Sequence, residues 1–365
     1  MTDFLPGIDL CRAFYTEAVA PILRTASPGL VHSAALLGPG SDVLGYDSPR
    51  STDHDWGPRV LLFVSARDAA TRADELVGPL GRELPSRFRG RSTGYGPPGP
   101  DGSRLPDRAG HRPVAHRVEV HDLGRWLQKA LGFDPRGGIR TADWLLTPSQ
   151  TLLEVTAGAV FHDGLGELDP VRKALGWYPR DVWLYLLASQ WRRIEQEEPF
   201  AARCAEAGDD LGARLVAARL VRDLMRLAFL VERRYAPYTK WLGSAFARLE
   251  IGPALAPILQ AALDASDDGD RQAALTKASE LVATRFNALG VTEWVDPSVR
   301  TFHRRPYLVL GADRFADASR AAISDDRVRA LPLGLGSIDQ WVDSTDVQSQ
   351  VRRARRTALV YGLDG

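Results

Sequence analysis

Two small residues and two carboxylates, separated by a polar turn, are the part of the sequence best suited to chemistry. Gly40 and Ser41 follow an apolar run, and Asp53 and Asp55 come after a gap of eleven residues. In an extended strand, side chains two positions apart project from the same face, roughly 6.5–7 Å apart, so these carboxylates are spaced to bracket a hard cation. A Gly-Ser turn lets backbone N–H groups approach phosphate oxygens. The pattern predicts a metal–phosphate site suited to phosphoryl or nucleotidyl transfer.

This pattern resembles the signature of the nucleotidyltransferase superfamily, which includes DNA polymerase beta and the aminoglycoside nucleotidyltransferases. The resemblance implies that Gly40 and Ser41 abut the triphosphate of a nucleoside triphosphate (NTP) co-substrate, and that Asp53 and Asp55 bind two Mg²⁺ ions. A third carboxylate comes from a later strand in that family. Glu119 is the matching candidate, as metal ligand or general base; the alternative is a surface residue paired with an arginine such as Arg117.

Longer stretches resemble a largely uncharacterised branch of nucleotidyltransferase-like proteins: GSDVLGYDSPRSTDHDWG, RRYAPYTKWLG and EEPFAARCAEAGDDLG. His54 departs from the superfamily pattern, which places an apolar residue between the two carboxylates. The departure favours other chemistry in the same cleft as an alternative to a standard magnesium site.

A second group of candidate residues lies in the later, helical part of the chain. Kanamycin-type members supply a lysine from their helical domain to the nucleotide phosphates, and Lys240 resembles it, with Tyr238 beside it as a nucleotide contact. The alternative is a lysine stem lying on aromatic surface with its head in water. Arg226 belongs to an arginine stripe on one helix face, which predicts either a wall facing the triphosphate or ion pairs with neighbouring helices. The stripe comprises Arg219, Arg222, Arg226 and Arg233.

Strands are predicted in the first part of the chain and helices in the second. The predicted strands are Val31–Leu37, Val60–Val64 and Val114–Val120. The predicted helices are Ile8–Leu23, Ala66–Leu84, Asp181–Ile194, Leu211–Arg234, Trp241–Leu249, Pro253–Ala265 and Arg271–Leu289, with short helices from Leu123 to Val160.

The fold class is therefore α/β plus all-α. We expect a nucleotidyltransferase-like mixed-sheet domain at 1–160, a helical domain at 161–295, and a mixed C-terminal segment at 296–365 that packs on the first two. Between 86 and 112, arginines among glycines and prolines predict a long segment without regular structure, either a lid or a surface loop.

Composition excludes several classes of protein. The 46 basic and 46 acidic residues balance, so no global charge indicates nucleic acid or a membrane surface. Cys11 and Cys204 are far apart, which argues against a disulfide framework or a structural zinc site. No apolar run approaches the ~20 residues that span a bilayer, and no leader pattern opens the sequence, so we expect a cytoplasmic protein.

The leading prediction is an enzyme, a Mg²⁺-dependent nucleotidyltransferase that moves a nucleoside monophosphate from an NTP to a hydroxyl of a small molecule or a protein. One alternative is a glycoside hydrolase or transferase that uses the same carboxylates. Another is a non-catalytic binding protein. The sequence specifies neither the acceptor, nor the preferred nucleotide, nor the oligomeric state.

Overall fold

A four-stranded mixed sheet organises the first part of the chain in the computed structural model, which describes residues 4–100 and 102–362. The strand order is β5-β2-β1-β6; β1 is antiparallel to both of its neighbours, and β2 is parallel to β5. The strands are β1 Ser33–Leu36, β2 Arg59–Val64, β5 Arg117–Asp122 and β6 Ala159–Asp163. The three predicted strands are confirmed, whereas β6, which begins at the end of the stretch predicted to hold short helices, was not predicted.

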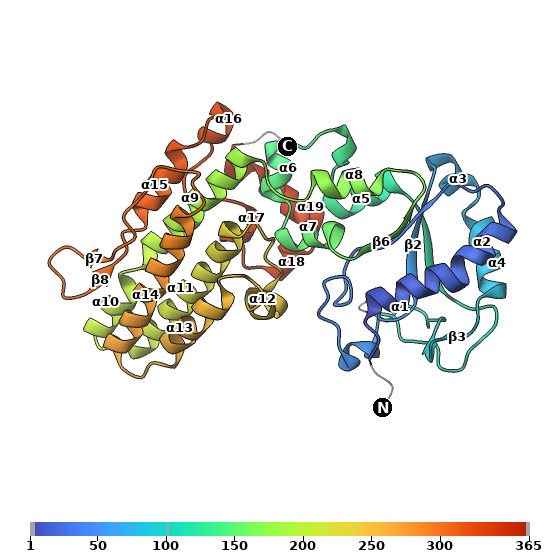
Figure 1. Cartoon of the computed structure of the whole chain (residues 1–365), viewed down its shortest axis with the longest axis horizontal. Helices are drawn as coiled ribbons and strands as arrows, with labels where there is room; N and C mark the ends of the chain where they lie inside the picture. Colours follow the sequence, from blue (N-terminus) through green and yellow to red (C-terminus); the bar gives the residue numbers. More distant parts are fainter. Residues whose placement is uncertain (1–3, 101, 363–365) are drawn as a thin grey trace. The chain divides into compact units, whose positions relative to one another are not determined.

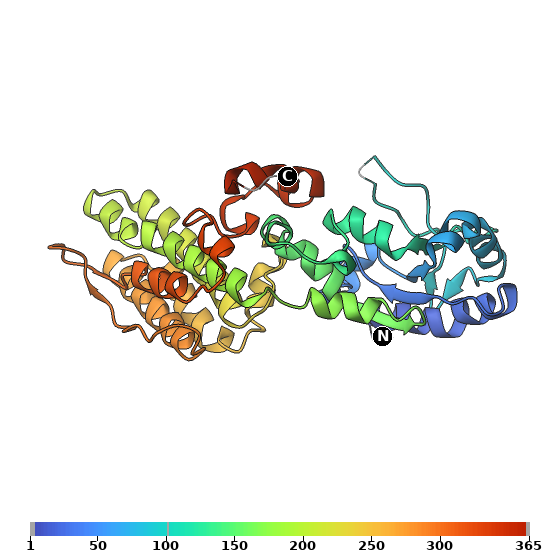
Figure 2. The same cartoon turned by 90° about the horizontal axis from the view of Figure 1, so that it is seen from above.

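The alternation of side chains along these strands buries one face of the sheet under helices. Val60, Leu62 and Val64 of β2 belong to a core that also contains buried residues of a long N-terminal helical segment and of α4. Figure 2 shows the N-terminal segment, in blue, along one side of the strands. This segment is α1 Gly7–Phe14, a π-helical turn Tyr15–Val19 and α2 Ala20–Ala26, and the helices after β2 are α3 Ala66–Thr71 and α4 Ala73–Glu83.

The other face of the sheet carries the odd-numbered residues of β2 and β5. Leu61 pairs with Glu119 and Phe63 with His121, so Glu119 and His121 of β5 both project from this face. Phe63 packs edge-on against Trp126 of α5, with 5.5 Å between ring centroids. The remaining helices around this sheet are α5 Leu123–Leu131, α7 Ser149–Thr156 and α8 Leu168–Ala174.

Contacts between residues that are far apart in the sequence hold the edge strand β6 against β1. The Ser33 hydroxyl donates to Asp163 Oδ1 at 2.6 Å. At the other end of β6, the Gly158 N–H donates to the Val43 carbonyl oxygen at 2.9 Å. Gly158 has a φ of +66°, and a Cβ there would lie 2.1 Å from the Leu36 carbonyl oxygen. Only glycine fits this junction without displacing the end of β1.

The chain divides into two compact units, and the second is helical. Unit 1 comprises Met1–Ile139 and Thr151–Gly176; unit 2 comprises Arg140–Gln150 and Trp177–Gly365. The mixed sheet in one unit and the helices in the other confirm the coarse expectation of an α/β part and a helical part (Figure 1).

Long helices of unit 2 pack on one another because most residues on their facing sides are apolar and buried. Asp209 and Asp267 cap the N-termini of α11 and α14 by accepting backbone N–H bonds. Within the described residues, no helix is both long enough and apolar enough to span a membrane. The helices are α6 Thr141–Leu146, α9 Arg180–Glu197, α10 Phe200–Glu206, α11 Asp210–Val231, α12 Thr239–Phe246, α13 Gly252–Asp264, α14 Asp268–Asn287, α15 Asp313–Ala321, α16 Asp326–Arg329, α17 Ile338–Trp341, α18 Thr345–Gln348 and α19 Val351–Arg356.

Short strands also occur in two other places. The segment 86–112 contains a small hairpin of β3 Arg87–Phe88 and β4 Arg91–Ser92, so the prediction of no regular structure is wrong there. Its two turn residues, Arg89 and Gly90, have φ values of +48° and +77°, the combination that a tight hairpin with the twist of its strands requires. In unit 2, β7 Arg300–Thr301 pairs with β8 Leu308–Val309.

Replacing Gly158 by alanine tests the junction between β1 and β6. Gly166 is the matched control, since its φ of +69° is similar and nothing lies within 4 Å of an added Cβ. Gly166→Ala should cost about 1–2 kcal/mol for the left-handed backbone alone. Gly158→Ala should lower the free energy of unfolding further, because the methyl also collides with the Leu36 carbonyl. Urea unfolding followed by circular dichroism measures both; equal losses would show that the junction is not closed as described.

Candidate functional site

A buried ion pair lies beside the Gly40-Ser41 turn. Asp42 is 2% exposed and Arg59 is 8% exposed, and both guanidinium Nη atoms donate to the Asp42 carboxylate, Nη2 to Oδ1 at 2.9 Å. Burial alone would lower the pKa of Arg59, but the charge and hydrogen bonds of Asp42 outweigh it and raise the pKa overall. Asp42 follows β1, and Arg59 is the first residue of β2. The ion pair therefore links the turn after β1 to the start of β2.

Gly40 makes room for this ion pair. Its φ is +153°, and a Cβ there would lie 2.4 Å from Asp42 Oδ1 and 2.7 Å from Arg59 Nη2. The carbonyl oxygen of Ser41 accepts the N–H of Tyr46 at 2.8 Å, which holds the turn together. The Gly-Ser pair therefore has a structural reason in this chain, and its predicted contact with a triphosphate stays a prediction.

Asp53 and Asp55 do not lie on an extended strand, which corrects the sequence-based expectation. Asp53 ends a 3-10 helix that begins at Pro49, and β2 begins only at Arg59. Asp55 has a φ of +50°, which breaks the alternation that would align the two side chains. Asp53 accepts the N–H of His54 at 3.1 Å and its side chain is 65% exposed. The two carboxylates therefore have different partners.

Asp55 and Glu119 lie on either side of the Arg117 guanidinium. Arg117 Nη1 donates to Asp55 Oδ1 at 2.7 Å, and its Nε is 3.8 Å from Glu119 Oε1. The other Glu119 oxygen is 3.3 Å from His121 Nε2. The hydrogen bond from His121, helped by the charge of Arg117, lowers the pKa of Glu119 against the opposing effect of burial. Glu119 thus keeps its charge and contacts the same guanidinium as Asp55. Its pairing with Arg117, which was the alternative prediction, is also present.

The backbone around Asp55 is held by several groups. Its N–H donates to the Arg104 carbonyl at 2.9 Å, and its own carbonyl oxygen accepts from Arg59 Nη1 at 3.2 Å. The Arg117 guanidinium also lies 5.4 Å from the centre of the Tyr95 ring, a cation–π contact. These contacts fix the Asp55 carboxylate next to Arg117 despite the strained φ.

Within the described residues, no three His, Cys, Asp or Glu side chains are grouped to hold a metal ion. Asp53, Asp55 and Glu119 therefore do not form the three-carboxylate set expected from the resemblance. Asp55 and Glu119 alone offer oxygen ligands beside one cation. That donor set fits Mg²⁺, which keeps several waters and is often held by one or two carboxylates plus substrate phosphates.

Cys11 is buried near Asp42 and Arg59, and its thiol is unreactive. It is fully buried, its thiol contacts the Gly57 carbonyl oxygen at 3.4 Å, and burial raises the pKa of the thiol to about 12. A thiol so protonated is a poor nucleophile and metal ligand.

The other predicted site residues belong to unit 2. Lys240 is exposed, with its Nζ 5.0 Å from the centre of the Trp241 ring, as the alternative of a lysine on aromatic surface describes. Tyr238 and Arg226 line one pocket of that unit. Their predicted contacts with a nucleotide stay predictions.

Most arginines of the predicted stripe, on α11 and just after its end, make ion pairs or ring contacts within unit 2. Arg219 pairs with Glu197, and Arg222 pairs with Asp343. Arg233 lies 4.2 Å over the Trp183 ring. Two of the four arginines therefore form the ion pairs foreseen as the alternative to an anion-facing wall.

Sequence reasoning missed Asp42 and Arg59 as residues that build the site. A signal was present: Asp42 directly follows the Gly-Ser pair, and Arg59 is a charged residue that opens an otherwise apolar strand. Because a buried charge needs a partner of opposite charge, a charged residue at the start of an apolar strand indicates a nearby carboxylate such as Asp42.

Comparisons with known proteins add little to this geometry. Residues 144–242 match a family described as a domain of unknown function, DUF4037. A comparison with curated proteins finds no match. One solved structure, a nucleotidyltransferase-like protein from Exiguobacterium sibiricum, is 16% identical over 81% of this chain and 82% of its own, with a TM-score of 0.32. At that TM-score the similarity carries no argument about fold or function.

Removing one partner of the buried ion pair should destabilise unit 1 strongly. Asp42→Ala leaves the Arg59 guanidinium buried and uncompensated, and such losses cost about 3–5 kcal/mol. Glu75→Gln is the control, because its ion pair with Arg72 is exposed and worth at most about 1 kcal/mol. The midpoint of urea unfolding measures both changes; an unchanged midpoint for Asp42→Ala would mean that the pair is not buried in solution.

Proposed function

We propose that unit 1 binds an NTP with Mg²⁺ and transfers its nucleoside monophosphate to a hydroxyl group of a small molecule or a protein. One observation carries this proposal: Asp55 and Glu119 flank a single cation, Arg117. Glu119 projects from the sheet face that carries the odd-numbered residues of β2 and β5, in the unit where the Gly40-Ser41 turn follows β1. Carboxylates that already hold one cation supply the charge and oxygen ligands that a divalent ion needs.

The residues would divide the work as follows. Asp55 and Glu119 hold Mg²⁺, which neutralises charge on the phosphates when bound. Backbone N–H groups at Gly40 and Ser41 approach the phosphate oxygens. A hydroxyl oxygen of the acceptor forms a bond to the α-phosphorus, the bond to pyrophosphate breaks, and a carboxylate, Glu119 or Asp53, accepts the hydroxyl proton. Arg117, released from the carboxylates, is then available to pair with phosphate oxygens.

Calorimetric titration with ATP, GTP, CTP and UTP tests the proposal. Wild type should bind at least one NTP only when Mg²⁺ is present. Asp55→Asn and Glu119→Gln should each weaken that binding ~10-fold or more, the size of a lost charge-assisted interaction. Glu75→Gln, an exposed carboxylate of the same unit, is the control and should bind as wild type does. Failure of every NTP to bind would refute the proposal.

Arg117 should compete with metal for the same carboxylates. Arg117→Gln removes the resident cation, so Mn²⁺ added without nucleotide should bind this variant several-fold more tightly than wild type. Glu119→Gln should bind Mn²⁺ more weakly. Electron paramagnetic resonance of free Mn²⁺ measures both affinities. Weaker Mn²⁺ binding by Arg117→Gln would show that the carboxylates and the guanidinium do not share one cation position.

A non-catalytic binding protein is the second candidate, and one observation favours it. Arg117 already pairs with both carboxylates, so these residues have a structural role that needs no metal. If the chain is a non-catalytic binding protein, neither NTP nor Mn²⁺ should bind. The two titrations above therefore distinguish this function from nucleotidyl transfer.

A further inference from the structure

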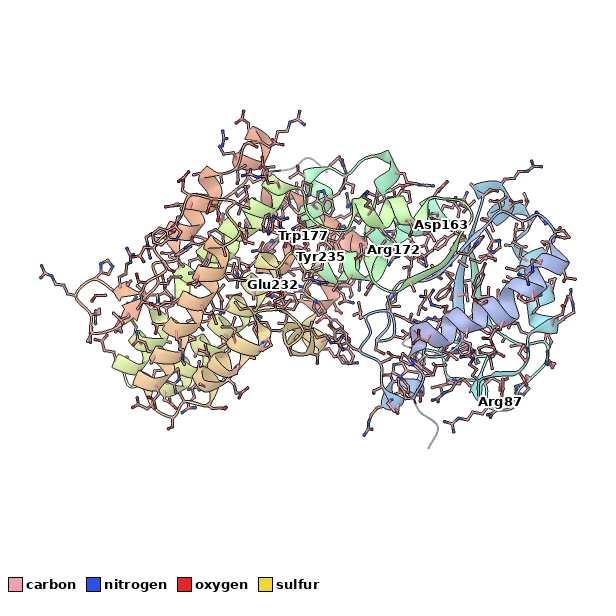
Figure 3. All side chains as sticks on the ribbon, viewed as in Figure 1. Arg87, Asp163, Arg172, Trp177, Glu232 and Tyr235 are labelled. Carbon is pink, nitrogen blue, oxygen red and sulfur yellow. The ribbon has the colours of Figure 1, made fainter. Side chains whose placement is uncertain are left out.

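A pocket that is partly open to solvent lies wholly within unit 2. It is formed by the residues after α8, the end of α11 with the loop that follows, and the start of α17. Figure 3 shows two of its lining residues, Trp177 and Tyr235, next to one another.

Aromatic rings make one wall of the pocket. The centroids of Trp177 and Tyr235 are 5.0 Å apart with 39° between the planes, and Tyr178 meets Tyr235 edge-on at 5.2 Å. The indole N–H of Trp177 is buried, and no acceptor for it lies among the described residues. Such a wall offers a flat apolar surface for another ring, together with an unused donor.

A guanidinium without an ion pair among the described residues lines the same pocket. Arg226 Nη1 donates to the main-chain carbonyl oxygen of Asp339, and no carboxylate within residues 4–100 and 102–362 lies at ion-pair distance from it. Burial lowers the pKa of Arg226, so its charge is poorly solvated. Its stripe neighbours Arg219 and Arg222 both have carboxylate partners. Arg226 is therefore the cation of this stripe that an anion would stabilise most.

Asp339, which also lines the pocket, is the acidic residue whose charge most raises the pKa of Arg226, although it does not lie at ion-pair distance. The Asp339 carboxyl accepts the backbone N–H of Ser149, whose distance from Oδ2 is 2.8 Å. Burial raises the pKa of Asp339, against the opposing effects of that hydrogen bond and of Arg226. Because the Asp339 carboxyl is bonded to the backbone, the Arg226 guanidinium has no direct carboxylate partner among the described residues.

We propose that this pocket binds a small planar aromatic anion, with its ring against Trp177 and Tyr235 and its carboxylate or phosphate on Arg226. The guanidinium offers two parallel donors, which suit either oxyanion. The ring requirement comes from the wall and the charge requirement from Arg226, so aliphatic acids satisfy only the second and neutral sugars satisfy neither. The site uses residues of unit 2 alone and does not depend on nucleotidyl transfer in unit 1.

Calorimetry with matched probes tests both requirements. Indole-3-acetate and phenyl phosphate are the aromatic anions, and their relative affinities distinguish a carboxylate site from a phosphate site. Indole-3-acetamide lacks the charge and acetate lacks the ring. We expect at least one aromatic anion to bind, with the amide and acetate ~10-fold weaker or worse, because a charged hydrogen bond is lost or the ring contact is missing.

Variants assign the charge to one residue. Arg226→Gln should reduce indole-3-acetate binding to the level of the amide, and Arg226→Lys should restore part of it. Arg222→Gln, one turn earlier and paired with Asp343, is the matched control and should bind as wild type does. If Arg226→Gln is misfolded by circular dichroism, Trp177→Leu replaces it and should weaken both the acid and the amide.

Several results would overturn the proposal. These are no binding of either aromatic anion, equal affinity for acid and amide, or unchanged affinity in Arg226→Gln. Asp55→Asn should leave indole-3-acetate binding intact even if it abolishes NTP binding. Displacement of the probe by ATP with Mg²⁺, lost again in Asp55→Asn, would assign the pocket to the transfer site and refute a separate one.

Discussion

The charge of Arg59, buried at the start of β2, is the constraint on which the rest of the candidate site depends. A buried guanidinium needs a carboxylate, and Asp42 supplies it from the turn after β1. Because the pair lies so close to the turn, position 40 has room only for glycine. The same guanidinium also donates to the carbonyl oxygen of Asp55, so the pair shapes both ends of the segment between β1 and β2.

The sheet and long helices were predictable where the pattern of apolar residues was strong. The apolar run RVLLFV predicts the strand β2, and the helical periodicity of residues 211–231 predicts the helix α11. β6 was missed because AVFHD is short and ends in two polar residues, and its identity as a strand comes from its pairing with β1. The hairpin in 86–112 was missed because its turn depends on the φ of Arg89, which composition does not reveal.

The candidate site was predictable in part for a related reason. Residue type and spacing selected Asp55, and the resemblance to a known superfamily selected Glu119. Which arginine meets which carboxylate was not predictable, since arginine is abundant throughout this chain and the partners are distant in sequence. The positive φ of Asp55 and the 3-10 helix that ends at Asp53 were likewise not predictable, and together they separate the partners of Asp53 from those of Asp55.

The late position of β6 in the chain constrains how unit 1 can be made. Ser33 of β1 meets Asp163 of β6 across 130 residues of sequence. Between them the chain leaves unit 1 for residues 140–150, which belong to unit 2. During synthesis on the ribosome, one edge of β1 therefore stays unpaired until part of the second unit already exists. Nor does any uninterrupted stretch of the gene encode the first unit by itself.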